Sequence, residues 1–239
     1  MDDQVTKLVD KIWNKYLETP PDRRLLIAIA GIPGSGKTTL AQILTAQLNA
    51  RHSSLEPSSS PSPIAVYVPM DGFHLTRAQL SAMPDPTTAH ARRGAEFTFD
   101  GAAFLRLAQR LREPLTASSP AIFAPSFDHA AKDPREDDIA VLPTHRVAVL
   151  EGNYLALDRE PWRSAAALAD EVWFVEVGRD VARRRLVRRH LAAGIAADEA
   201  EAERRADEND LRNGDEILSE RVRADEVIVS NEDEGWVHR

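Results

Sequence analysis

The stretch Gly31-Ile32-Pro33-Gly34-Ser35-Gly36-Lys37-Thr38 fits the pattern G-x-x-x-x-G-K-[ST], the signature of a phosphate-binding P-loop. An apolar run at residues 25–30 precedes it and is typical of a buried parallel strand. Residues 38–49 follow, with leucine and isoleucine side chains at helical spacing. A strand, a glycine-rich loop and a helix in this order predict backbone N–H groups that surround a phosphate at the positive end of the helix.

The polar residues of this motif have distinct expected roles. We expect Lys37 to reach the β- and γ-phosphates of a nucleotide, and the Thr38 hydroxyl to ligate Mg²⁺. Because P-loops occur in kinases, GTPases and motors alike, the motif alone does not name a function. The sequence predicts ATP and Mg²⁺ as cofactors, and the residues expected to bind the nucleotide are Gly31, Gly34, Ser35, Gly36, Lys37, Thr38 and Thr39.

Length and composition limit the classes of protein to which this chain can belong. The 239 residues predict an N-terminal helix over residues 1–23 that docks on the core, followed by a single domain over 24–239. The net charge of −8 argues against nucleic-acid and membrane-surface partners. The absence of cysteine excludes disulfides, and we expect a cytoplasmic protein with no membrane span. A homo-oligomer remains one of the open alternatives for its assembly.

Apolar runs alternate with helical patterns along most of the chain. This alternation predicts an α/β fold with a mainly parallel five-stranded sheet and helices on both faces. The Ser/Pro-rich residues 51–63 read as a flexible loop, and we expect a helix over 198–221 to break near Asn213-Gly214. Further strands are expected at 64–68, 121–124, 147–150, 172–177 and 227–229, and further helices at 4–17, 100–112 and 180–193.

Two carboxylates follow predicted strands. Ligands of open parallel sheets bind outside the carboxyl ends of the strands, so Asp71 and Glu151 are candidates for the mouth of the site. In a phosphoryl-transfer enzyme Asp71 would accept the proton of the acceptor hydroxyl, and Glu151 would help to hold Mg²⁺. The alternative is that each carboxylate belongs to an ordinary turn, at Asp71-Gly72 and at Glu151-Gly152-Asn153.

Arginines are concentrated in the predicted helix over 180–193. Arg185 and Arg189 are four residues apart and share a face, from which guanidinium groups could stabilise a moving phosphoryl group. The alternative is a solvated surface, since the five arginines of this helix cannot all lie on one face. Arg93, in the segment before residue 99, either binds the substrate or is exposed.

Several strings occur in the order found in one known family. They are Met70-Asp71-Gly72-Phe73-His74, Phe97-Thr98-Phe99-Asp100, Pro125-Ser126-Phe127-Asp128 and Glu151-Gly152-Asn153-Tyr154-Leu155. With the P-loop, they resemble the phosphoribulokinase/uridine kinase family of P-loop kinases over about residues 24–230. The strings EGNYL and Pro161-Trp162 resemble a bacterial and fungal branch of it. The resemblance implies a three-layer α/β/α P-loop kinase fold with a helical lid at about residues 183–213.

The resemblance also implies roles for individual residues. Asp71 takes the place of the family's catalytic base, and Asp100 that of the aspartate that binds ribose hydroxyls. Phe127 stands in for the aromatic residue of the base pocket, and Glu151 takes the place of the glutamate that assists Mg²⁺. The residues expected to act in catalysis are Asp71, Lys37, Arg185 and Arg189; those expected to contact the substrate are Asp71, Phe73, His74, Arg93, Asp100, Phe127 and Asp128.

The implied activity is ATP-dependent phosphorylation of a hydroxyl on a small molecule. The best candidate acceptor is a ribonucleoside such as uridine or cytidine. Pantothenate, nicotinamide riboside and sugars stay open, because the fold alone does not decide among acceptors. Gly72 and His74 are closer to the pantothenate kinase pattern. A P-loop NTPase with a regulatory role is disfavoured, since the guanine-reading string Asn-Lys-x-Asp is absent. The string Glu208-Asn209-Asp210-Leu211-x-Asn213-Gly214 resembles one of the EGNYL branch and has no assigned role.

Overall fold

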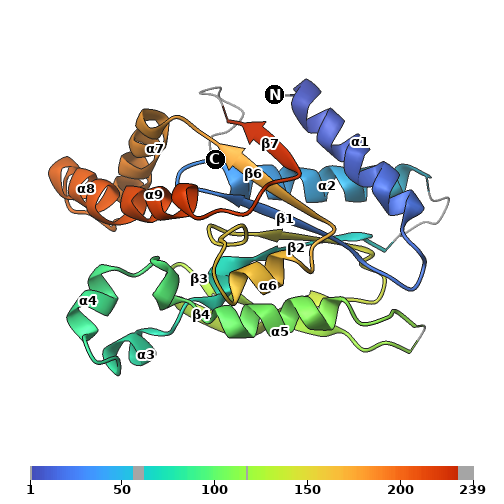
Figure 1. The fold of residues 1–239 in the computed structure, drawn as a ribbon, viewed down its shortest axis with the longest axis horizontal. Helices are drawn as coiled ribbons and strands as arrows, with labels where there is room; N and C mark the ends of the chain where they lie inside the picture. Colours follow the sequence, from blue (N-terminus) through green and yellow to red (C-terminus); the bar gives the residue numbers. More distant parts are fainter. Residues whose placement is uncertain (1, 56–61, 117, 231–239) are drawn as a thin grey trace.

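A five-stranded parallel sheet forms the centre of the molecule (Figure 1). The computed structural model describes residues 2–55, 62–116 and 118–230. The strand order is β2-β5-β1-β6-β7, and the five parallel strands agree with the predicted sheet. The strands are β1 (Leu25–Gly31), β2 (Ala65–Pro69), β5 (Val147–Glu151), β6 (Glu171–Glu176) and β7 (Glu226–Val229).

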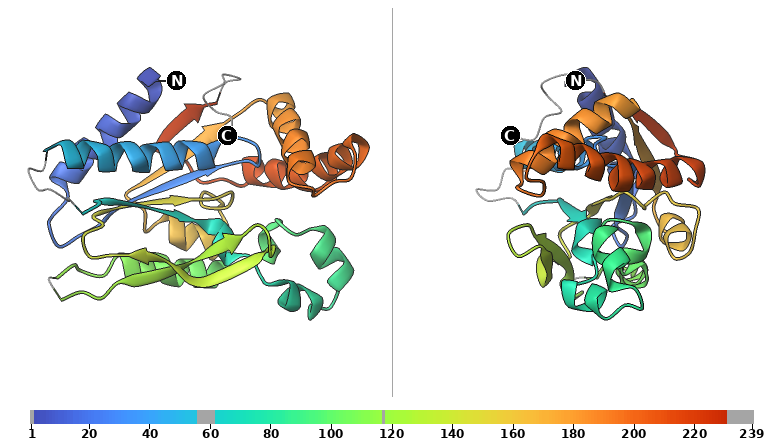
Figure 2. Two further views of the ribbon diagram at one scale, coloured as in Figure 1. Left: turned by 180° about the vertical axis from the view of Figure 1, so that it is seen from behind. Right: turned by 90° about the vertical axis from the view of Figure 1, so that its left-hand side faces the viewer.

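Helices cover both faces of this sheet and give the predicted three layers (Figures 1 and 2). On one face, α1 (Asp2–Glu18) and α2 (Lys37–Leu55) pack against the sheet through an apolar cluster that includes Ile12, Leu44 and Trp173. On the other face, α5 (Gly101–Leu111) and α6 (Trp162–Ala166) bury Phe104 and Trp162 in a second cluster. The strands are buried on both sides, which explains their continuous apolar sequences.

An antiparallel hairpin lies outside the parallel sheet. It consists of β3 (Ile122–Asp128) and β4 (Asp133–Val141), so the strand predicted at 121–124 belongs to this hairpin. The sequence did not reveal β4 because its central residues, 135–138, are exposed and charged, and no apolar alternation marks it. Two 3₁₀ turns, η1 (Met70–Phe73) and η2 (Glu96–Thr98), and two short helices, α3 (Arg77–Ser81) and α4 (Pro86–Ala91), complete this side of the molecule.

Three helices, which we call the lid helices, stand at the carboxyl end of the sheet, with α3 and α4 on the same side (Figure 1). They are α7 (Arg179–Ala192), α8 (Glu199–Arg205) and α9 (Leu211–Ser219), and a π-helical turn (Ala206–Asp210) joins the last two. The break predicted near Asn213-Gly214 is wrong, because both residues are buried inside α9. A Cβ on Gly214 would lie 3.3 Å from the Cβ of Ile32, so the glycine lets α9 approach the P-loop closely.

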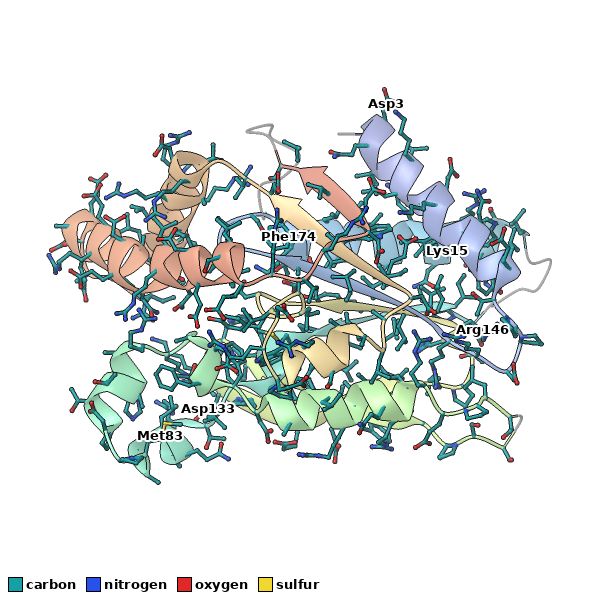
Figure 3. All side chains as sticks on the ribbon, viewed as in Figure 1. Asp3, Lys15, Met83, Asp133, Arg146 and Phe174 are labelled. Carbon is teal, nitrogen blue, oxygen red and sulfur yellow. The ribbon has the colours of Figure 1, made fainter. Side chains whose placement is uncertain are left out.

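The N-terminal helix is attached by charge as well as by apolar packing. Lys15 Nζ lies 2.7 Å from Glu171 at the start of β6, far from the lid helices (Figure 3). The predicted loop over 51–63 needs a correction, because its first five residues are the last residues of α2, and 56–61 lie outside the described residues. None of the helices in the described parts of the chain has the length and hydrophobicity needed to span a bilayer.

Candidate active site

The P-loop connects β1 to α2 in a conformation that needs glycine. Gly34 has φ of 81° and Gly36 has φ of 89°, in the left-handed region that other residues rarely adopt. A Cβ on Gly34 would lie 2.8 Å from the backbone oxygen of Ala182 in α7. The loop is therefore held between the start of α2 and the first lid helix, where its backbone N–H groups stand at the positive end of α2.

Lys37, Thr38 and Glu151 meet at this point. The hydroxyl of Thr38 donates to Glu151 Oε1 at 3.1 Å, and the ammonium of Lys37 lies 3.9 Å from the same oxygen. The hydroxyl of Tyr67 on β2 donates to Glu151 Oε2 at 2.8 Å. Glu151 and Lys37 are only 5% and 8% exposed, so water does little to screen their charges.

Burial shifts the pKa of both Lys37 and Glu151 away from its ordinary value. It lowers the pKa of the Lys37 ammonium, although the nearby Glu151 and Asp71 carboxylates act in the opposite direction. It raises the pKa of the Glu151 carboxyl, and the positive charge of Lys37 offsets this only in part. A site with such groups is suited to a ligand that brings negative charge to Lys37 and positive charge to Glu151.

The donor set at the P-loop fits a nucleotide and a magnesium ion. Ser35 Oγ and Thr39 Oγ1 are buried and have no hydrogen-bond partner within the described residues, and both residues are predicted to bind the nucleotide. Thr38 and Glu151 supply the hard oxygen atoms that Mg²⁺ prefers. Mg²⁺ usually takes one or two protein ligands together with phosphate oxygens, so a pair of protein oxygens suffices.

Asp71 lies at the same edge of the sheet. Glu151 on β5 is paired with Pro69 on β2 and with Ile29 on β1. Asp71 comes two residues after Pro69, and Gly31, the first residue of the P-loop, comes two residues after Ile29. The Asp71 side chain is exposed, and its backbone oxygen accepts a hydrogen bond from the His74 N–H. A Cβ on Gly72 would come within 2.1 Å of the Pro125 oxygen, so this glycine lets η1 touch the hairpin.

An aromatic group lies beside Asp71. The His74 ring is 4.0 Å from the Phe99 ring and 4.9 Å from the Phe127 ring, measured between centroids. Burial lowers the pKa of His74 despite the nearby Asp71 carboxylate, which favours the neutral imidazole at pH 7. The structure thus brings together His74 and Phe127, two of the residues predicted to contact the substrate.

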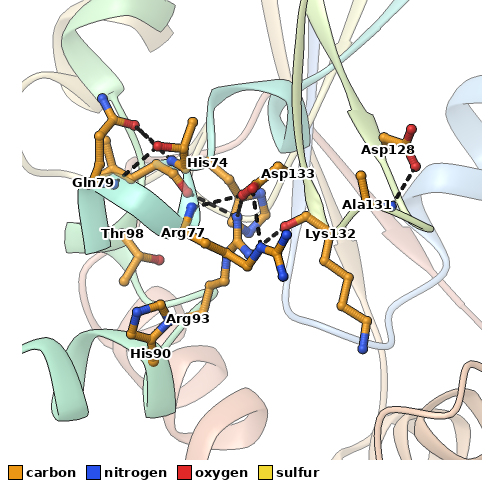
Figure 4. A network of polar contacts seen from close by, with 12 residues as sticks. His74, Arg77, Gln79, His90, Arg93, Thr98, Asp128, Ala131, Lys132 and Asp133 are labelled. Carbon is orange, nitrogen blue, oxygen red and sulfur yellow. Dashed lines mark hydrogen bonds and ion pairs between the residues drawn. The ribbon is translucent and has the colours of Figure 1, made fainter. Parts of the chain in front are cut away.

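Arg93 attaches the hairpin to a neighbouring segment, and Asp128 stabilises the turn of the hairpin (Figure 4). Arg93 donates to the Leu75 oxygen at 3.0 Å and to the Lys132 oxygen, and it pairs with Asp133 at 3.0 Å. Asp128 Oδ1 accepts from the N–H groups at positions 130 and 131, at 2.8 and 2.9 Å. Both side chains therefore have internal partners at the tip of the hairpin, and their predicted substrate contacts stay predictions.

Asp100 and Phe73 also have structural partners. Asp100 caps α5, because its Oδ1 accepts from the Ala103 N–H at 2.7 Å. Phe73 is a core residue, 5% exposed, and its ring packs edge-on against Phe104. Phe73 is therefore part of the core, and its predicted contact with the substrate stays a prediction.

The arginines of α7 divide into different environments. Arg185 donates to the Gly34 oxygen at 3.2 Å and to Ser230 Oγ at 2.9 Å, so it braces the backbone of the P-loop. Arg189 is more than half exposed and lies 3.8 Å from Asp210. Arg183 pairs with Asp207 at 2.8 Å on the surface, as the solvated-surface alternative predicts for some of the five.

Four residues near the site had no role in the sequence analysis. Tyr67 lies within an apolar strand sequence, and His190 lies within the highly charged sequence of α7, so neither stood out as a site residue. Asp210 binds His190 Nε2 at 2.8 Å, and Asn209 Nδ2 donates to the Arg93 oxygen at 3.0 Å. The string around Asn209 and Asp210 was the only signal that could have found these two, and it carried no chemistry by itself.

Several known proteins resemble this chain in sequence or in fold. No model of a protein family matches the chain. The "ATP-dependent kinase-like protein notR'" of Aspergillus versicolor is 61% identical over 162 residues, which are 68% of this chain and 94% of that protein. The "Putative uridine kinase C227.14" of Schizosaccharomyces pombe is 42% identical over 205 residues, 85% of this chain and 83% of that protein. A crystal structure described as a "putative fructose transport system kinase from Silicibacter sp. TM1040" is 34% identical, with a TM-score of 0.78 over 93% of this chain and 98% of that one.

The parallel sheet, the P-loop and the carboxylates at the strand ends define a P-loop kinase. The names of the relatives support the use of ATP. Identity to the uridine kinase-like protein along most of both chains shows that this chain belongs to the phosphoribulokinase/uridine kinase family.

Proposed function

We propose that this kinase transfers the γ-phosphate of ATP to a hydroxyl of a small molecule, and that the acceptor is a ribonucleoside such as uridine or cytidine. The observation that carries the proposal is the position of Asp71. It is an exposed carboxylate one strand away from Glu151, level with the P-loop, and near enough to Lys37 for its charge to act on that ammonium.

In this proposal each side chain has one task. Thr38 and Glu151 would hold Mg²⁺, which would neutralise charge on the phosphates when bound. Asp71 accepts the proton of the acceptor hydroxyl as the new phosphate ester forms. Lys37 faces the transferred phosphoryl group, and Arg189 is a lid arginine that is more than half exposed and whose charge acts on the Lys37 ammonium. The catalytic effect comes mainly from position and charge.

The surroundings of Asp71 favour an uncharged acceptor with a ring. His74, Phe99 and Phe127 form the aromatic group beside it, and aromatic faces suit a planar base. Arg93 is occupied by Asp133 and by backbone oxygens, which disfavours an acceptor with a carboxylate or phosphate of its own. Asn153 Oδ1 is buried without a hydrogen-bond partner in the described part of the chain and could accept from a sugar hydroxyl.

Other acceptors are outcomes of the same test. Sugars are the main alternative, because the 34% identical Silicibacter protein is described as a fructose transport system kinase. Pantothenate carries a carboxylate, and nicotinamide riboside carries a positive charge that would suit the exposed Asp71. A regulatory NTPase would hydrolyse ATP without stimulation by any acceptor.

The test is a coupled assay of ADP formation with MgATP and a panel of uridine, cytidine, nicotinamide riboside, pantothenate and fructose. We expect uridine or cytidine to stimulate ADP formation and to yield the 5′-monophosphate, identified by mass spectrometry. Stimulation by fructose or pantothenate alone would replace the ribonucleoside with that acceptor. No stimulation by any of the five would contradict the proposed acceptor class.

A further inference from the structure

The string around Asn209, which the sequence left without a role, binds the segment Arg92–Gly94 from the opposite side of the site. Arg92 Nη1 donates to the Glu208 backbone oxygen at 2.9 Å, and Arg92 Nη2 donates to Asn213 Oδ1 at 2.7 Å. Asn209 returns a bond from Nδ2 to the Arg93 oxygen at 3.0 Å. Three hydrogen bonds thus join parts of the chain that are more than a hundred residues apart.

Two of these bonds are partly buried, whereas the bond from Arg92 to the Glu208 oxygen is exposed. Asn209 is 5% exposed and Asn213 is 1% exposed, so both amides lie between the lid helices and the segment rather than in water. Asn209 lies in the π-helical turn Ala206–Asp210 and contacts the segment from there. Such π-helical turns often occur at functional sites. The two terminal nitrogens of Arg92 bind two different residues, Glu208 and Asn213. The planar guanidinium therefore fixes the orientation of the turn relative to the segment as well as the distance between them.

The next residue of the same turn contacts the phosphate side of the site. Asp210 Oδ2 is 2.8 Å from His190 Nε2, and Asp210 Oδ1 is 3.8 Å from Arg189. The charges of Arg189 and Asp210 both reach the Lys37 ammonium: after the larger effect of burial, Arg189 lowers its pKa and Asp210 raises it. A displacement of this turn would therefore move the lid charges relative to Lys37.

The segment Arg92–Gly94 is anchored to the acceptor side by other contacts. The Tyr154 hydroxyl donates to the Gly94 oxygen at 2.9 Å, and Tyr154 follows Glu151 by only three residues. Arg93 stands over the Phe127 ring, 5.6 Å from its centroid. One short segment thus touches the aromatic group beside Asp71 and the turn that carries Asp210.

We propose that Arg92 is a positioning residue for phosphoryl transfer, because it fixes the turn that sets Asp210 and Arg189 over Lys37. This inference rests on the proposed function. Arg92 touches neither ATP nor the acceptor in this scheme; it acts through Glu208 and Asn213. Loss of its bonds leaves the P-loop intact and lets the lid helices separate from the acceptor side.

The variants Arg92→Ala and Arg92→Lys test the proposal against Arg159→Ala as a matched control. Arg159 also binds Glu216 in α9 and Glu220 directly after it, at 2.7 Å each, but among the described residues it makes no hydrogen bond or ion pair with the segment Arg92–Gly94. Three quantities are measured for each full-length variant: amide hydrogen exchange over 206–213, the kinetics of uridine phosphorylation, and ADP formation from MgATP without acceptor.

For Arg92→Ala we expect exchange over 206–213 to rise at least about tenfold. We expect kcat to fall by about 10- to 100-fold with the KM for ATP within about twofold, since misplacement by about 1 Å can cost a factor of a hundred. Arg92→Lys keeps the positive charge but loses one of the two hydrogen bonds. Its kcat and its exchange rate should therefore lie between those of the wild type and those of Arg92→Ala. Arg159→Ala should change exchange only near 216–220 and leave kcat within about twofold.

The proposal is overturned if Arg92→Ala and Arg159→Ala have the same kcat, or if exchange over 206–213 does not change. A failure of the proposed function looks different, because the wild-type protein then phosphorylates no nucleoside. In that case the rate of ADP formation without acceptor tests the role of Arg92. A change of about fivefold or more in this rate in Arg92→Ala alone, together with the expected rise in exchange, supports that role. Equal rates in all variants contradict it.

Discussion

The Thr38 hydroxyl and the Glu151 carboxylate lie 3.1 Å apart, although 113 residues separate them in the chain. One comes from the start of α2 and the other from the end of β5. Their contact makes a pair of oxygen atoms at the mouth of the sheet, beside the Lys37 ammonium. This pair is the place where we expect the divalent cation of the proposed reaction.

Replacement of Glu151 by Gln should weaken the response to magnesium more than the binding of nucleotide. The amide keeps the shape of the side chain but removes the charge that would face the cation, so we expect the Mg²⁺ concentration at half-maximal rate to rise about tenfold or more. The measurement is a magnesium titration at saturating ATP. Glu176→Gln is the control, since Glu176 ends the strand β6 and pairs with Arg221. A normal magnesium response in the Glu151 variant would refute its role.

Asp71→Asn should abolish most turnover while nucleotide binding persists. Without a group to accept the hydroxyl proton, we expect kcat to fall by about 10²–10⁴, with the affinity for a non-hydrolysable ATP analogue within about twofold of wild type. The control is Asp85→Asn, because Asp85 is an exposed cap of α4 and asparagine caps a helix equally well. Near-normal turnover on the acceptor would show that Asp71 is not the base.

His74 should make stability depend on pH. Burial lowers its pKa below the ordinary value of 6.5, so the unfolded chain binds more protons than the folded chain as the pH falls through that value. Stability from this residue is therefore full above about pH 6.5 and is lost on acidification. We expect His74→Phe to flatten the fall in unfolding free energy between pH 7.5 and 5.5, measured by urea denaturation. An equal fall in both proteins would contradict this.

His145 serves as the comparison in that experiment. Burial and the positive charge of Arg24 lower its pKa as well, but it lies before β5, away from the site. His145→Gln should remove a second, separate part of the pH dependence. The two changes should add in the double variant.

Gly72→Ala should damage both stability and activity. The added Cβ would lie 2.1 Å from the Pro125 oxygen, so η1 and the hairpin must separate and Asp71 must move. We expect a loss of about 1–3 kcal/mol in unfolding free energy together with a lower kcat. At Gly178, where the nearest atom is 3.9 Å from an added Cβ, the same substitution should cost no more than about 1 kcal/mol. Equal losses at both positions would contradict the steric argument.

The sequence revealed those parts of the site that are contiguous in the chain. The P-loop and the strand ends at Asp71 and Glu151 could be predicted, since each follows an apolar run and parallel strands end at one edge. The bonds between Arg92 and Asn213 could not, because a pairing over 121 residues depends on the packing of α9 against the P-loop. Strand β4 escaped prediction because its exposed charges carry no alternation.

Charge joins the two ends of the described chain. Lys11 in the first helix lies 2.8 Å from Glu171 and 2.9 Å from Glu226 in the last strand. During synthesis the first helix leaves the ribosome about two hundred residues before its final partner, and domains fold as units. Helix α1 is therefore fully paired only after β7 has been synthesised, and a truncation before β7 would leave Lys11 without one of its two carboxylate partners.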